Sequence, residues 1–96
     1  MQAEYDSTAN AISIVITDVP HADKSDEVHQ RAIVALANGK PVEVQLLYPD
    51  LGIDEPLAAA SARHGLDLEA LAAAAQSALA APDRVVKLEV AARVPA

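Results

Sequence analysis

The histidines are the first side chains of this sequence that could do chemistry, because imidazole is a common metal ligand and general base. There are three of them, His21, His29 and His64. Their spacing fits neither the i, i+4 pair of a helical zinc site nor a zinc finger, and no cysteine completes a site. Asp18 and Asp23 lie near His21, but a loop that binds a hard cation needs more oxygen ligands in a fixed order. The sequence therefore predicts no metal and no cofactor.

Acyl transfer is not expected either, because no serine of this sequence stands in a nucleophile elbow. An enzyme with an acidic site is the alternative from another class. It needs Asp6, Asp18 and either Glu43 or His29 to converge in one cleft, with two titratable side chains within hydrogen-bond reach. We expect no such cleft, so the chain is predicted not to be an enzyme.

The charge of the chain favours protein partners over nucleic acid. Fourteen acidic residues against seven basic ones give a formal net charge of −7, which repels a phosphate backbone.

No cysteine is present for a disulfide. No apolar run approaches the ~18 to 20 residues that cross a bilayer. We therefore expect a cytoplasmic protein that binds no membrane and no nucleic acid.

The composition predicts a thin hydrophobic core. The 96 residues include no Phe and no Trp, so the large buried areas that aromatic rings supply are missing. Alanine, the commonest residue type with 22 copies, removes much less apolar area from water than leucine or isoleucine does. Small scaffolds often gain the missing burial through association, so a homodimer is expected.

Alternating apolar residues predict strands in both halves of the chain. The strongest local pattern is Asn38-Gly39, which favours a type I′ turn between two such runs. Residues 18–30 are rich in acids and predict a solvated loop. The predicted strands lie near residues 3–6, 11–17, 31–37, 42–48 and 84–92.

Two helices are predicted between the fourth and the last of these strands. Asp54 is the expected N-cap of the first helix, which covers 55–63. Asp67 is the expected N-cap of the second helix, at 67–80. Gly65 suits the left-handed residue that ends the first helix. The inner stripe of the second helix is predicted to consist of Leu68, Leu71, Ala75 and Leu79.

These elements predict an α+β fold in a single domain of residues 1–96. A small antiparallel sheet of hairpins is covered on one face by two helices. With 3–6 and 11–17 counted as one interrupted strand, the final strand completes the order β-β-β-α-α-β. The predicted parts are the hairpin sheet at 4–48, the helical pair at 54–80 and the final strand at 84–92.

The first half of the chain resembles the family of small bacterial proteins called domain of unknown function 2283, over about residues 4 to 48. Members begin with Tyr-Asp and a strand, and then pass through a glycine turn into a second strand. The matching residues are Tyr5-Asp6, Ala9, Ala11-Ile12, Ile14, Gly39, Val42, Val44, Leu46 and Leu47. Asn10 and Gln45 replace carboxylates that are common there, which removes general-base capacity. Ser13 and Glu43 also depart from the pattern. The resemblance implies an accessory or antitoxin-like role.

A ribbon-helix-helix regulator is a further alternative, because the strand at 42–48 is followed by two helices. In that fold, the outward side chains of the strand read the major groove and should be basic or carry amides. Here they are Glu43, Gln45 and Leu47, with only Lys40 nearby. A plain helical hairpin after a sheet fits better.

The leading hypothesis is a non-enzymatic module that binds a protein partner or itself. Its interaction surface is expected in the acidic 18–30 loop or on the outer face of the second helix, where small residues allow another backbone to come close. The candidate residues are Asp18, His21, Asp23, Asp26, Glu27, Ala73, Gln76 and Ala80.

Overall fold

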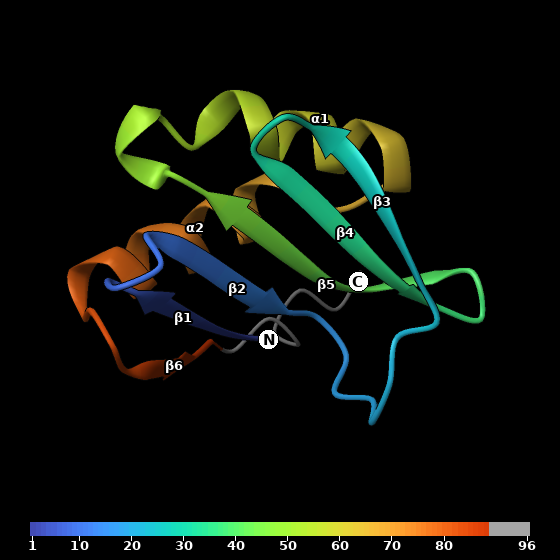
Figure 1. The fold of residues 1–96 in the computed structure, drawn as a ribbon, viewed down its shortest axis with the longest axis horizontal. Helices are drawn as coiled ribbons and strands as arrows, with labels where there is room; N and C mark the ends of the chain where they lie inside the picture. The colour runs from blue at the N-terminus through green and yellow to red at the C-terminus, as the bar shows by residue number, and fades with distance from the viewer. Residues whose placement is uncertain (89–96) are drawn as a thin grey trace, which may run out of the picture.

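The computed structural model describes residues 1–88 of the chain, which form six strands and two α-helices (Figure 1). A 3₁₀ turn, η1 (Pro49–Leu51), connects the last of the first five strands to the helices. The elements are β1 (Gln2–Asp6), β2 (Ala11–Val15), β3 (Lys24–His29), β4 (Ala32–Ala37), β5 (Lys40–Leu47), α1 (Asp54–His64), α2 (Leu68–Ala80) and β6 (Val85–Lys87).

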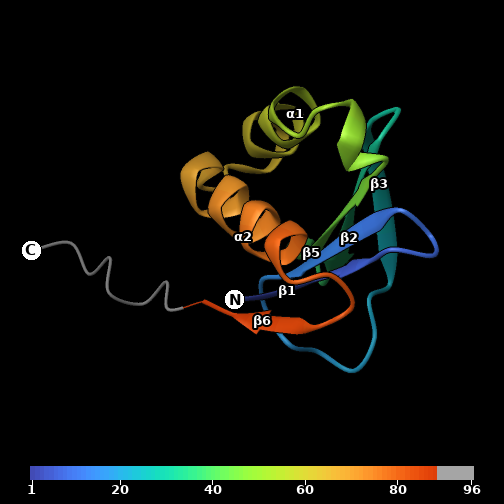
Figure 2. The same cartoon turned by 90° about the vertical axis from the view of Figure 1, so that its left-hand side faces the viewer.

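All six strands belong to one antiparallel sheet in the order β3-β4-β5-β2-β1-β6. Helix α1 packs on β3, β4 and β5, and α2 packs on β1, β2 and β6. Both helices lie on the same face of the sheet (Figure 2). The α+β fold with two helices on one face of an antiparallel sheet is thus confirmed. The predicted order β-β-β-α-α-β is wrong before the helices, because five strands precede α1.

The core lies between the sheet and the helices. Alternation along β2 buries Ile12 and Ile14 completely, as the sequence predicts. The other fully buried large side chains are Val34, Val44, Leu46, Pro56, Leu57 and Leu71. Alanines of α2 fill the remaining contacts, so the helix comes close to the sheet. Neither tyrosine is fully buried, and the core therefore consists of aliphatic side chains.

The turn at Asn38-Gly39 has the predicted conformation. Both residues have positive φ, 54° and 79°, which is what a type I′ turn requires. It joins β4 to β5 and sets their register, with Ala37 opposite Lys40.

The prediction of a loop over residues 18–30 is wrong in its second half, because Lys24–His29 forms β3. This strand is the edge of the sheet and pairs only with β4. Its charged residues suit an exposed edge, where they discourage pairing with other chains. The side that faces α1 carries Asp26 and Val28, both half-buried.

The helices differ from the prediction in two details. Helix α1 begins at Asp54 and its N-cap is Ile53, not Asp54. In α2, the buried residues are Leu71, Ala74, Ala75 and Ala78, whereas Leu68 is 40% exposed. Two predictions are confirmed: Asp67 caps α2 by accepting from the Ala70 N–H, and Gly65 is left-handed with φ 65°.

The described part of the predicted last strand, 84–88, is a strand only in its middle. Strand β6 covers Val85–Lys87 and pairs with β1, where Val86 lies opposite Ala3. Residues 89–92 of the predicted strand lie outside the described residues. Within residues 1–88, neither helix is long and apolar enough to cross a membrane.

Asp83 joins the turn before β6 to the β1–β2 turn. Its carboxylate accepts from the Ser7 backbone N–H at 2.9 Å and from the Ser7 hydroxyl at 2.7 Å. These hydrogen bonds favour the charged form, so the pKa of Asp83 lies below its ordinary value.

This pKa shift predicts a loss of stability in acid. The pKa of Asp83 is lower in the folded than in the unfolded chain, so its charged carboxylate adds to the free energy of unfolding. This contribution is complete above the unfolded pKa and is lost as the pH falls through the folded pKa, below about pH 4. Asp83→Asn should therefore lower stability at pH 6 and flatten its decline in acid. Urea unfolding at several pH values between about 3 and 6 measures how the free energy of unfolding changes with pH in the wild type and in the variant. Identical pH profiles for the two proteins would contradict the prediction.

Candidate functional site

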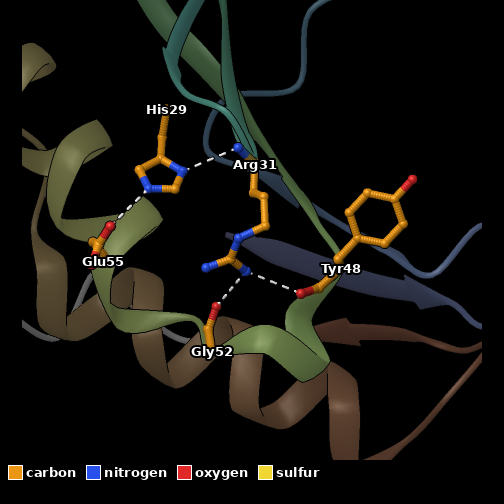
Figure 3. Close-up of polar contacts among 5 residues, drawn as sticks. All are labelled: His29, Arg31, Tyr48, Gly52 and Glu55. Carbon is orange, nitrogen blue, oxygen red and sulfur yellow. Dashed lines mark hydrogen bonds and ion pairs between the residues drawn. The ribbon is translucent and has the colours of Figure 1, made fainter.

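The most unusual surface feature is the loop after β5, which we call the clamped loop, Tyr48–Gly52. Arg31, in the turn between β3 and β4, reaches across it (Figure 3). One guanidinium nitrogen, Nη1, donates to the carbonyl oxygens of both Tyr48, at 3.0 Å, and Gly52, at 2.8 Å. A charged donor strengthens these bonds. Arg31 thus holds the two ends of the loop together.

Asn10 fixes the same loop from the β1–β2 turn. Its backbone oxygen accepts from the Tyr48 N–H at 2.9 Å, and its side-chain Nδ2 donates to Asp50 Oδ1 at 2.8 Å. The Tyr5 hydroxyl in turn donates to Asn10 Oδ1 at 2.9 Å. The amide of Asn10 therefore serves as both donor and acceptor, which a carboxylate in its place could not do.

Tyr48 adopts a backbone conformation that its side chain disfavours. Its φ of 49° and ψ of 60° are left-handed, which is rare for a bulky residue. The ring is 53% exposed, and Leu51 in the same loop is 68% exposed. Pro49 between them is buried and anchors the loop. The loop presents two apolar side chains to solvent from a fixed backbone, and strain of this kind is concentrated at functional sites.

His29 connects this region to the start of α1. Its Nδ1 accepts from the Arg31 backbone N–H at 3.1 Å, so Nε2 carries the proton and donates to Glu55 Oε1 at 3.1 Å (Figure 3). Glu55 is 86% exposed. The imidazole therefore positions the turn that carries Arg31.

The interaction residues predicted from the sequence do not form one surface. Asp18, His21 and Asp23 are exposed in the segment between β2 and β3. Asp26 and Glu27 are in β3, which packs on α1, whereas α2 packs on the opposite half of the sheet. The residues predicted on α2, Ala73, Gln76 and Ala80, are exposed there.

Asp26 has a structural role within the chain. Its Oδ2 accepts from His64 Nε2 at 2.8 Å and lies 3.4 Å from Arg63 Nε. Both partners are at the end of α1. This carboxylate therefore ties the edge strand to the helix.

The titratable residues that the enzyme alternative needs do not all converge in one cleft. Asp18 and Glu43 line one hollow of ≈ 280 Å³, but the hydrogen bond of Glu43 is with the Ser13 hydroxyl. Asp6 lines a different hollow, and His29 pairs with Glu55 at the other end of the sheet from Asp18. Among residues 1–88, no three His, Asp or Glu side chains are placed to hold a metal ion.

The strand of the ribbon-helix-helix alternative, β5, lies in the middle of the sheet. It pairs with β4 on one side and with β2 on the other. In a ribbon-helix-helix dimer, this strand pairs with its counterpart from a second subunit, and the backbone of β5 already has both its partners within the chain.

Sequence reasoning missed the residues of the clamped loop. No protein-family model, curated protein or solved structure matches the chain. The signal in the sequence was Tyr48-Pro49, since the residue before a proline ends a strand or helix, but nothing in it predicts that Arg31 reaches this turn.

Proposed function

We propose that this chain is a non-enzymatic interaction module that binds a protein partner through the clamped loop. One observation carries the proposal: Tyr48 is held in a strained conformation with its ring exposed, in a loop fixed by Arg31. Tyrosine is enriched at the energetically dominant positions of protein interfaces. A rigid loop also loses little conformational entropy on binding.

The charge of the loop region indicates the chemistry of the partner. Three exposed carboxylates are close to Tyr48 and Leu51 in the sequence, namely Asp50, Asp54 and Glu55. Residues 48–55 contain no lysine or arginine. The proposed partner has an apolar pocket for the two side chains and basic residues at its rim. An accessory or antitoxin-like protein, as the family resemblance implies, would use such a surface.

Co-purification from the native host tests this function. The tagged wild-type chain is compared with Tyr48→Asn and Leu51→Ser. Leu68→Ser, which removes an exposed apolar side chain from α2, is the matched control. Support requires one identified protein that is lost with both loop variants and kept with the control. Recovery of no partner, or of the same partner by all four chains, contradicts the proposal.

The expected homodimer is part of the proposal and has its own measurement. The support is the core, whose largest fully buried side chains are aliphatic. Light scattering should give twice the chain mass of 10.0 kDa. A monomer at every concentration up to about 0.1 mM would contradict self-association.

Tyr48→Asn should raise the stability of the chain while it removes partner binding. Asparagine tolerates the left-handed conformation, and relief of the strain should stabilise the fold by about 0.5 to 1 kcal/mol. Urea unfolding measures the change, with Leu51→Ser as a comparison that leaves the backbone conformation alone. A loss of stability would show that the Tyr48 ring makes necessary contacts.

A further inference from the structure

Strand β4 is apolar on both faces, although the helices cover only one. All six of its residues are apolar. Ala32 and Val34 are fully buried under the helices, whereas Ile33 and Ala35 project from the opposite face and are half-buried. We call this opposite side of the sheet the open face. A solvated face of an antiparallel sheet normally carries polar residues, and strands that are apolar on both faces are usually covered on both.

Carboxylates lie on either side of this apolar row. Ile33 lies opposite Glu27 of β3, and Ala35 lies opposite Glu43 of β5. Because neighbouring strands are about 4.8 Å apart, β3 and β5 are about 10 Å apart across β4. Glu27 and Glu43 are also offset by two residues along β4, so their backbones are about 12 Å apart. The open face is therefore an apolar stripe with an acid on each side.

The rest of the open face is also acidic. Glu4 and Asp6 of β1 project from it, and Lys87 of β6 adds a cation. A partner that covers this face must neutralise carboxylates, since an unpaired buried charge is costly.

We propose that the open face along β4 binds a basic amphipathic helix of a protein partner. A helix with its side chains is about 10 to 12 Å wide, which matches the distance of about 10 Å between β3 and β5, the strands that carry Glu27 and Glu43. Its apolar stripe would cover Ile33 and Ala35, and lysines or arginines on its two flanks would pair with the carboxylates.

Neither helix of residues 1–88 would serve this role in a second copy of the chain. Helix α2 contains no lysine or arginine, and α1 has only Arg63, which lies beside Asp26. The open face of a second copy would bring carboxylates toward carboxylates. Charge complementarity therefore selects a different, basic protein.

The test uses a synthetic peptide of about 18 residues, five helical turns, with leucines on one face and lysines on both flanks. Its affinity for the full 96-residue chain is measured by fluorescence anisotropy. A peptide with glutamates in place of the lysines is the control probe. Three variants are compared with the wild type: Glu27→Lys, Glu69→Lys as the charge-matched control on the exposed side of α2, and Tyr48→Asn.

We expect Glu27→Lys to weaken binding at least about tenfold, while the other two variants change it less than about twofold. Backbone amide shifts of the wild-type chain should concentrate on β3, β4 and β5, which gives a result that is independent of any variant. The proposal is overturned if Glu69→Lys weakens binding as much as Glu27→Lys, if the glutamate peptide binds equally well, or if the shifts map to the helices. Loss of binding in Tyr48→Asn alone would assign the peptide to the clamped loop.

Discussion

Ile14→Ala is expected to lower the free energy of unfolding by about 2 to 4 kcal/mol. Ile14 is fully buried in β2, the strand between β5 and β1, and its side chain belongs to the core under the helices. The alanine loses the transfer free energy of the removed methyl groups and leaves a cavity. Urea unfolding followed by circular dichroism measures the change.

Val44→Ala, directly opposite Ile14 in the sheet, is expected to cost about 2 to 4 kcal/mol in the same way. Since the two side chains are neighbours, the double variant should depart from the sum of the single effects. Asn10→Ala is a contrasting control, because Asn10 holds the turn and lies outside the core cluster. Negligible losses at both Ile14 and Val44 would mean that these strands lie outside the cooperative core.

The central strands could be predicted because local pattern and tertiary burial agree there. Residues of β2 and β5 alternate between the helix-covered face and the open face, and period-2 alternation is the signal that a half-buried strand gives. The turn at Asn38-Gly39 needs positive φ, and these two residue types tolerate it. Sequence and fold point to the same structure in this half of the sheet.

Strand β3 could not be predicted in the same way. Its residues, Lys24–His29, include three charged side chains, and the turn that follows it at Gln30-Arg31 contains neither Gly nor Asn. The strand is stabilised by contacts that are distant in sequence, namely Asp26 with His64 and His29 with Glu55. The polar residues that predict a loop thus form an edge strand and attach it to α1.

The candidate site depends on distances between segments that no local pattern reveals. Arg31 contacts the backbone 17 and 21 residues away, and Tyr48 has a conformation that residue preferences argue against. The sequence predicted the interaction surface on acidic and alanine-rich segments. One of the predicted residues, Asp26, instead forms a hydrogen bond with His64 of the same chain. Departures from local preference are expected where function or strain is involved.

Arg31→Ala is expected to lower the free energy of unfolding by about 2 kcal/mol and to release the clamped loop. The substitution removes both charge-assisted hydrogen bonds, which are worth about 1.5 to 3 kcal/mol each at most, and the partial exposure of the site reduces their net effect. Without them, Tyr48 has less to hold it in its strained conformation. Urea unfolding measures the global loss, and hydrogen exchange at the Leu51 and Gly52 amides, which donate within the turn, measures the local one.

Arg31→Lys separates the charge from the geometry. A lysine keeps the positive charge but is shorter and lacks the planar fork of guanidinium, so it can satisfy the two carbonyls only in part. We expect it to restore part of the stability and less of the exchange protection at Leu51 and Gly52.

If Arg31→Ala leaves the exchange of both amides unchanged, Asn10 and Pro49 alone hold the loop. If Arg31→Ala speeds exchange in β5 and the loop equally, Arg31 supports the whole sheet. Exchange that increases in the loop alone would show that Arg31 fixes the segment that presents Tyr48 and Leu51, as binding through a preorganised loop requires.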